Sequence, residues 1–458
     1  MKKIFASIVF AAMAVTSFAG GLLTNTNQSA SFVRNPMRYA SLETDAIYFN
    51  PAGTAFFNKG WSFSANWQMI WQDRDIVFTN PLIEPSDTEY KGSVYVPCMP
   101  TLYAAYNTGN WTFSGFFGMP GGGGKAEFEN GLPLFNNLIG GLGQKMGLPV
   151  KMEGASQFES TQYLFALQLG AAYKINKNLS AYAGLRTNYV SNNYKGTIKA
   201  NTDLSALGAG MLNVATVNLD MDQSGVAFAP IFGIDYKVGK FNFAVKYEFR
   251  AVTIVENKTN KMEIAANKAL DKIPALGAMG ISSAAIEKKA QAGLGGYLGG
   301  FADGNKLRSD APALLTLATS YDMTSRLKVM AGYNYYFDKD AKIESLLGGN
   351  TMNTLSRNTF EILGGIEYQL TKKLLLSAGF QFSDFGINEN YLSDISFIND
   401  SFTTGLGAKY SLNDKLDFNF GVCYANYAKG TKNDYDTSCT TNYLRKTYNV
   451  AIGVDFRF

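Results

Sequence analysis

Few residues of this chain could carry out covalent or metal chemistry. The sequence contains no histidine, which removes Ser-His and Cys-His catalysis together with histidine metal ligation. Its three cysteines, Cys98, Cys423 and Cys439, lack metal-ligand spacing and are an odd number for a set of disulfides. Asp and Glu residues show no clustering typical of paired acid–base catalysis. We therefore expect no catalytic residue, no metal, no cofactor and no enzyme activity.

Three cationic side chains could bind an anion instead. Arg186, Lys246 and Arg250 lie in segments of alternating polarity, in phase with the other polar residues of those segments. Such groups can bind a carboxylate, and the alternative is that each is paired with an acidic residue on a neighbouring strand. The formal net charge is +4 and falls to +2 without Lys2 and Lys3, which is too small an excess to indicate nucleic-acid binding.

The segments that carry these residues have the two-residue period of β-strands. At the C-terminus, six apolar residues from Tyr448 to Phe458 alternate with polar or small ones, so that one face suits lipid and the other suits water. The same alternation recurs along the chain and predicts fourteen strands. They are 61–78, 93–107, 110–119, 156–174, 179–195, 218–237, 241–256, 309–321, 326–338, 357–370, 374–386, 393–410, 415–429 and 442–458.

The connections between these strands alternate between short and long. Tight turns are expected at 107–110, 174–178, 238–240, 322–325, 371–373 and 411–414. Short turns on one side and long loops on the other are typical of outer-membrane barrels, whereas a soluble β-sandwich does not explain the asymmetry. The predicted fold is all-β: a 14-stranded antiparallel transmembrane β-barrel over residues 61–458, with the turns in the periplasm.

The N-terminal residues resemble a secretory signal. Lys2 and Lys3 precede an apolar run over residues 4–15 and a small-residue cleavage pattern at 17–19. A membrane anchor is the alternative, but the run is shorter than the roughly 18 residues that a spanning helix needs. We expect a signal peptide at 1–19. Residues 20–60 then lead into the first strand from the periplasm and are placed to fold back into the lumen as a plug.

Two of the long loops are unusually apolar. One, at 132–150, carries Leu134, Phe135, Leu138, Ile139 and Leu142. The other, at 259–298, contains two helix-like stretches in which apolar residues are interleaved with lysines. Two explanations stay open: the loops pack on each other as a lid, or their apolar surface captures ligands.

Residues 40–53, ASLETDAIYFNPAG, resemble the hatch motif of the FadL/TodX family of outer-membrane transporters of long-chain fatty acids and hydrocarbons. The layout of signal, N-terminal segment, fourteen strands, partly helical loops and terminal Phe458 is similar to that of the family. The resemblance implies a barrel plugged by a hatch that includes Asn50, Pro51, Ala52 and Gly53, and an apolar outer groove that collects substrate.

The resemblance also implies that the third strand bends inward and opens a lateral gap in the wall. Gly115, Gly118, Pro120 and Gly121 to Gly124 lie at the corresponding strand. Proline cannot donate to the strand ladder and glycine packs poorly there, so a break is plausible. The alternative is that these residues begin the loop after an ordinary short strand.

The function expected from this resemblance is passive uptake of fatty acids or other hydrophobic compounds across the outer membrane of a diderm bacterium, with hatch movement and lateral release. Expected partners are the transported compounds, outer-membrane lipid and lipopolysaccharide, and the barrel-assembly machinery, which would recognise the strand ending at Phe458. The main alternative is a general diffusion porin for small hydrophilic solutes. A barrel enzyme and an adhesin are further alternatives.

Overall fold

The computed structural model describes residues 28–81, 86–135, 139, 143, 150–152, 156–346, 350–394, 397–434 and 438–458. The predicted signal peptide 1–19 lies outside the described residues, and so do Leu138 and Leu142 of the first apolar loop.

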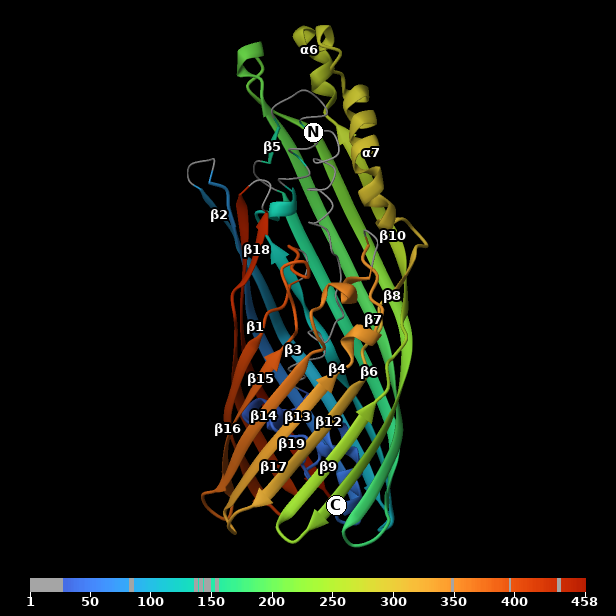
Figure 1. The fold of residues 1–458 in the computed structure, drawn as a ribbon, viewed down its shortest axis with the longest axis vertical. Helices are drawn as coiled ribbons and strands as arrows, with labels where there is room; N and C mark the ends of the chain where they lie inside the picture. Colours follow the sequence, from blue (N-terminus) through green and yellow to red (C-terminus); the bar gives the residue numbers. More distant parts are fainter. Residues whose placement is uncertain are drawn as a thin grey trace.

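Long antiparallel strands close into a barrel (Figure 1). Each wall strand pairs with the next one along the chain, and β19 pairs back onto β1 from Ser62–Arg457 to Thr79–Thr440. The fourteen wall strands are β1 (Gly60–Thr79), β3 (Gly92–Asn107), β4 (Trp111–Phe128), β6 (Gln157–Lys174), β7 (Leu179–Asp203), β8 (Met211–Val238), β9 (Phe241–Glu248), β12 (Leu314–Asp322), β13 (Leu327–Tyr336), β14 (Phe360–Gln369), β15 (Leu374–Asp384), β16 (Ser401–Asn413), β17 (Leu416–Tyr427) and β19 (Cys439–Arg457). The predicted 14-stranded antiparallel barrel is confirmed.

Side chains alternate between the two faces of this wall. On β8, Phe228, Phe232 and Ile234 point outward and are about half exposed, while Asp235 points inward and is buried. Aromatic pairs such as Trp111 and Tyr173, with ring centroids 4.7 Å apart, lie near the short turns. An apolar outer band bordered by aromatic residues suits a hydrocarbon environment. In the described part of the chain, no helix is long and apolar enough to cross a membrane.

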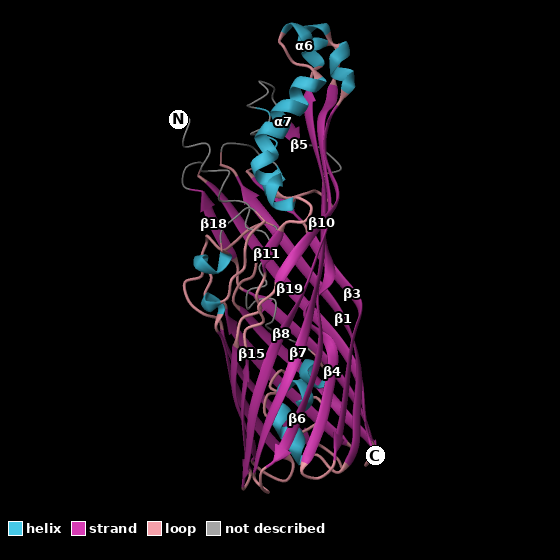
Figure 2. Cartoon of the chain, turned by 90° about the vertical axis from the view of Figure 1, so that its right-hand side faces the viewer, coloured by secondary structure: helices cyan, strands magenta, loops and turns pink. Residues whose placement is uncertain are grey.

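On the side of the long loops, β7 and β8 extend beyond the rim together with β10 (Ile254–Ala266) as an arm that carries helices (Figure 2). These are η3 (Lys268–Lys272), α6 (Pro274–Ala278), α7 (Ser283–Leu298) and η4 (Gly299–Phe301). The other short elements beyond the wall strands are β2 (Asp87–Tyr90), β5 (Lys151–Met152), η2 (Ser205–Leu207), β11 (Lys306–Arg308), η5 (Asp338–Asp340), η6 (Thr351–Thr354) and β18 (Gly430–Asp434).

Several strand boundaries differ from the prediction; β7, for example, ends at Asp203 instead of 195, and β8 begins at Met211 instead of 218. Strand β4 continues to Phe128 instead of ending at 119, because β6 stays paired with it through two bulges. The predicted strand 241–256 is split into β9 and β10, since Pro230 of the neighbouring strand lacks an N–H with which to continue the ladder. The predicted strand 393–410 begins only at Ser401, because Phe397 and Ile398 turn inward into apolar clusters instead of alternating.

The N-terminal segment lies inside the barrel, in the half nearest the short turns (Figure 2). It consists of α3 (Ala30–Arg34), α4 (Ala46–Phe49) and η1 (Pro51–Phe56), joined by irregular stretches, and we call residues 28–57 the hatch segment. Ser29 begins α3 as an N-cap by accepting a hydrogen bond from the Phe32 N–H, and Pro51 occupies the first turn of η1, where its missing N–H costs nothing.

Candidate functional site

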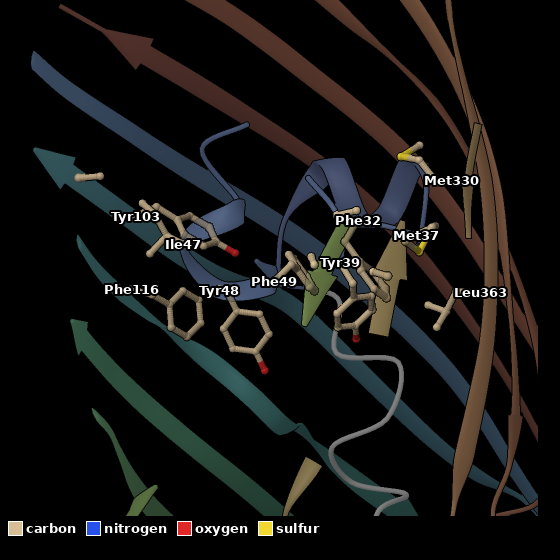
Figure 3. Packing of buried hydrophobic residues seen from close by; sticks show 14 of the residues in the cluster. Phe32, Met37, Tyr39, Ile47, Tyr48, Phe49, Tyr103, Phe116, Met330 and Leu363 are labelled. Carbon is tan, nitrogen blue, oxygen red and sulfur yellow. The ribbon is translucent and has the colours of Figure 1, made fainter. Parts of the chain in front are cut away.

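An aromatic core holds the hatch segment in the lumen (Figure 3). The rings of Phe32 and Phe49 are stacked with centroids 5.3 Å apart, and Tyr48 packs against Phe116 of β4 at 4.7 Å. Met37 of the hatch lies in the same buried cluster, which also includes wall residues of β13 and β14. Apolar contacts therefore tie the hatch to opposite sides of the barrel.

The predicted hatch motif docks on the wall. The Asn50 amide donates to a carboxylate oxygen of Asp235 (2.5 Å) and to the Ser41 carbonyl (3.1 Å). The Ala52 carbonyl accepts a hydrogen bond from the Ser180 hydroxyl (2.8 Å). At Gly53 a side chain would collide, since a Cβ would lie 2.5 Å from the Asn50 amide nitrogen. The motif thus fastens η1 to β7 and β8.

On the other side of the lumen, glycines of the wall make room for the hatch backbone. A Cβ at Gly405 would lie 2.5 Å from the Val33 carbonyl oxygen, and one at Gly421 would lie 2.5 Å from the Arg34 nitrogen. Both distances are shorter than real Cβ contacts allow. Helix α3 therefore rests directly on the backbone of β16 and β17.

A buried ion network completes the anchoring of the hatch. Arg34 and Arg38 both contact Glu367 of β14, at 2.9 and 2.8 Å, and Arg38 also contacts Asp45 at 2.8 Å. Glu43 pairs with both arginines and with Lys409 of β16. Burial by itself would raise the pKa of Glu43, but Lys409, Arg38 and Arg34 outweigh it and hold that pKa well below its usual range. The carboxylates therefore balance the cations in charge.

The predicted lumen cations lie at a second network. Arg186 and Lys246 are buried and share Glu248, at 2.5 and 2.6 Å. Lys246 also donates to the Tyr48 carbonyl (3.1 Å), so this cluster contacts the hatch. Arg250 lies apart from them, exposed, beside Asp310 and the Asp340 carbonyl. The structure therefore brings together two of the three predicted cations, and Glu248 already neutralises part of their charge.

The pairing of β3 with β4 is interrupted in the middle. The strands are paired from Gly92–Phe128 to Tyr95–Lys125 and again from Leu102–Phe117 onward, but not between these two stretches. On the far side of β4, the pairing with β6 has bulges at Gly118/Gly121 and Gly122/Gly124. Pro120 stands at the interruption with no N–H to donate, as do Pro97 and Pro100 of β3. Gly115 lies in the paired part, opposite Ala104.

Gln28 of the hatch segment connects the two edges of this interruption. Its side-chain amide donates to the Met119 carbonyl of β4 (2.7 Å). Its own carbonyl accepts hydrogen bonds from the hydroxyls of Thr101 (2.7 Å) and Tyr103 (2.6 Å) of β3. The hatch therefore lies directly against the place where the wall is unpaired.

A cavity of about 200 Å³ lies inside the barrel beside the interruption. Gln28 and Phe32 of the hatch contribute to its lining. Its lining on β3 and β4 is apolar or glycine-rich, with Val94, Val96, Met99, Met119, Pro120, Gly121, Gly122, Gly124, Ala126 and Phe128. Its charged lining residues are Arg74 and Arg445, both from the seam between β1 and β19.

A second depression, of about 490 Å³, lies on the wall just past the interruption. Leu102 and Phe117, the first pair after the unpaired stretch, are exposed and line this depression together with Gly115. The rest of its lining is mainly apolar. An apolar groove on the wall thus begins at one end of the interruption. The cavity inside the barrel borders the same interruption.

The apolar loops pack on one another above the barrel. Leu134 and Phe135 lie in a buried cluster with Leu392, Phe397 and Tyr443, and Ile139 packs in another cluster with residues of η3, α6 and α7. Asp394 joins these parts by accepting from the Leu134 N–H and the Tyr443 hydroxyl, both at 2.7 Å. Burial raises the pKa of Asp394, although these two hydrogen bonds lower it in part.

Comparison with known proteins agrees with this architecture. The family model described as outer membrane protein beta-barrel domain matches residues 273–458, and no curated protein matches the chain. A FadL homologue from Pseudomonas aeruginosa is 14% identical, with a TM-score of 0.64 over 98% of this chain and 100% of that chain. The toluene transporter TodX of Pseudomonas putida is 14% identical, with a TM-score of 0.58 over 94% and 98%. The toluene transporter TbuX of Ralstonia pickettii is 14% identical, with a TM-score of 0.53 over 91% and 94%.

The family model covers less than half of the chain, and the closed ring of wall strands defines the fold class, which is that of 14-stranded antiparallel β-barrels. Within this class the chain has the fold of the FadL homologue and of TodX. The resemblance that residues 40–53 indicated is therefore confirmed at the level of the fold.

Proposed function

We propose that this protein is a passive channel for uptake of hydrophobic compounds, which leave the barrel sideways through the wall. The observation that supports this most directly is the interruption between β3 and β4, with the inner cavity on one side and the apolar groove at its end. Such a route avoids water. Moving a twelve-carbon chain from an apolar pocket into water would cost about 10 kcal/mol, at roughly 0.8 kcal/mol per CH₂.

In this proposal the outer loops collect the solute. Leu134, Phe135 and Ile139 are buried in contacts between these loops, so a solute would reach them when the loops part. That Leu138 and Leu142 of the same loop take part in capture stays a prediction from the sequence. The solute then passes to the cavity beside Val96 and Met119. For release, the hydrogen bond from the Gln28 side chain to the Met119 carbonyl must break. This is the smallest movement of the hatch segment that would open the path. The toluene transporters with this fold make a hydrophobic cargo a reasonable choice.

The experiment is to lock the interruption. Met99 and Met119 lie in one buried cluster at its two edges, so Met99→Cys combined with Met119→Cys, in a Cys98→Ser background, should allow a disulfide or a short bifunctional cross-link. We expect cross-linking to stop uptake of a radiolabelled apolar compound into proteoliposomes, and reductant or a cleavable linker to restore it. Uptake that continues through the locked wall would contradict lateral release.

The matched control is Ala105→Cys with Ser114→Cys, a directly opposed pair in the intact part of the same two strands. Cross-linking there should leave uptake unchanged, because those strands are already joined. The porin alternative is separated by conductance in planar bilayers: a large, steady current that cross-linking does not alter would support a water-filled pore.

A further inference from the structure

The rim of short turns at one end of the barrel is strongly cationic (Figure 1). Five of the six short turns between wall strands carry an exposed lysine or arginine. The sixth, between β3 and β4, lies under the side chain of Lys59, because a Cβ at Gly109 of that turn would be 2.7 Å from the Lys59 Cε. The exposed acidic side chains in the same turns are those of Asp322 and Asp414. With one residue taken from each turn, we call Lys59, Lys177, Lys240, Arg326, Lys373 and Lys415 the rim cations.

The rim cations are not neutralised by carboxylates of the protein. None of the six makes a salt bridge within the part of the chain that the structure describes, and Asp322 lies 3.8 Å from Lys328 instead. Exposed lysines on the side of the long loops differ, since Lys195 is 3.3 Å from Asp220 and Lys306 is also ion-paired. The unbalanced positive charge is therefore a property of the turn rim and not of the whole surface.

Two of the rim lysines are held between neighbouring turns. Lys240 donates from Nζ to a backbone carbonyl (3.3 Å) in the turn that carries Arg326. Lys373 donates from Nζ to a backbone carbonyl (3.1 Å) at the end of β16, next to Lys415. An ammonium group has three donors, so each of these lysines keeps donors for an external acceptor. Each also shares its stretch of the rim with a second cation, and like charges repel unless an anion lies between them.

The rim cations border aromatic side chains that face outward from the wall. Trp61, two residues after Lys59, lies with its ring centroid 4.8 Å from that of Tyr106, and both side chains are exposed. Phe241 directly follows Lys240 and stacks on Tyr321 at 4.4 Å. Aromatic belts of membrane proteins lie at the level of the lipid headgroups. The rim cations are therefore within reach of headgroup phosphates, because long basic side chains extend toward the interface.

We propose that the rim cations bind the phosphate groups of anionic glycerophospholipids and enrich these lipids around the barrel in the periplasmic leaflet. The short turns of outer-membrane barrels lie on the periplasmic side, and basic residues next to a membrane surface attract anionic lipids. The rim cations follow the turns from β1 to β17 around the barrel, as a shell of lipid does, whereas a protein partner would cover one sector. The inference goes beyond the proposed function and holds whatever the barrel transports.

The test uses spin-labelled phosphatidylglycerol and phosphatidylcholine as probes, in phosphatidylcholine vesicles that contain the full-length protein. The electron paramagnetic resonance spectrum separates lipid held at the protein from bulk lipid, and so gives the relative association of the two probes. We expect at least about a twofold preference for phosphatidylglycerol, because one cation supplies roughly fivefold at its own site and lipids elsewhere on the barrel dilute it. The preference should decrease between about 0.1 and 1 M salt, as the screening length falls from about 10 to 3 Å.

The rim variant combines Lys240→Gln, Arg326→Gln, Lys373→Gln and Lys415→Gln and should lose most of the preference. These side chains are exposed, so we expect the barrel to stay folded, which heat-modifiable migration on gels verifies. A preference that this variant keeps would overturn the proposal. Equal association of both probes with the parent protein would also overturn it, and would leave an acidic periplasmic protein as the occupant of the rim.

The matched control combines Lys125→Gln, Lys195→Gln, Lys261→Gln and Lys306→Gln, which remove the same charge from exposed positions on the side of the long loops. It should keep the preference of the parent protein. A preference that the control and the rim variant lose equally would show that only net charge matters and would contradict a site at the rim. Loss of the preference when inorganic phosphate replaces chloride at equal ionic strength would overturn the lipid assignment in favour of a free anion.

Discussion

Gln28 and Met119 are joined by a hydrogen bond of 2.7 Å from the side-chain amide to the backbone carbonyl, and this bond links the hatch to the strand edge that β3 leaves unpaired. The carbonyl of Gln28 meanwhile accepts from Thr101 and Tyr103 on the opposite edge. One residue of the hatch therefore spans the interruption. In the proposed mechanism, opening of the wall and movement of the hatch are coupled through this residue.

Replacing Gln28 with alanine should loosen this contact. The substitution removes the bond to Met119 but keeps the backbone acceptor. A net hydrogen bond contributes about 1 kcal/mol, so we expect uptake of an apolar compound by proteoliposomes to rise about fivefold where opening limits the rate. Gln369→Ala, at the last residue of β14, whose side chain donates to the Thr371 carbonyl in the following turn, is the control and should have no effect. Slower or unchanged uptake in Gln28→Ala would show that this contact does not restrain the path.

Glu367→Ala should release the hatch while leaving the barrel closed. The change removes the wall partner that Arg34 and Arg38 share, and loss of one member of a buried pair costs about 3–5 kcal/mol. Limited proteolysis should cut within the hatch segment much faster than in the parent protein. Glu256→Ala removes an exposed partner of Lys306 and should change the rate little. Equal protection of the hatch in both variants would contradict the anchoring role of the network.

Acid should undock the hatch through Glu43. The pKa of this carboxyl in the folded protein lies well below its usual value, so its contribution is complete above about pH 4.3, the ordinary value, and is lost as the pH falls through the lowered pKa. Hydrogen exchange of the hatch amides should therefore be constant from pH 7 to 5, after correction for intrinsic rates, and accelerate below about pH 4. In Glu43→Gln the protection should already be weaker at pH 7 and should depend less on pH.

Asp394→Ala should separate the outer loops. The buried carboxylate accepts from both Leu134 and Tyr443, and leaving buried donors unpaired costs about 1–3 kcal/mol for each one. We expect faster hydrogen exchange at residues 132–135 with unchanged exchange in β12 to β15. Asp394→Asn keeps an acceptor oxygen and should lie between the parent protein and Asp394→Ala. Unchanged exchange at Leu134 would show that other contacts hold the loop.

The wall of the barrel could be predicted from the sequence because side chains along each strand alternately face the lumen and the lipid. That phase also placed Arg186 and Lys246 inside, and Glu248, two residues after Lys246, shares the face and indicates a pairing. The end of β4 could not be predicted, since Pro120 and the following glycines suit a loop as well as a bulged strand.

The cavity beside the interruption could not be predicted from the sequence, for a different reason. Arg74 and Arg445 are each in the lumen phase of their strands, but only the register between the first and the last wall strand brings them face to face. Gln28 reaches Met119 through an irregular path with no period to follow. Asp394 meets Leu134 across 260 positions of the chain. Such contacts depend on tertiary geometry, not on local pattern.

The bare backbone at Gly405 and Gly421 has a bearing on engineering and on evolution. Because α3 contacts the main chain there, the space that accepts the hatch segment depends partly on β16 and β17, which are far from it in the sequence. A methyl group added at Gly405 or Gly421 would displace the hatch segment although the sequence of the hatch segment itself is unchanged. A hatch segment grafted into another barrel would need glycines at the equivalent wall positions. Substitutions in the hatch segment and in the wall are therefore expected to occur together.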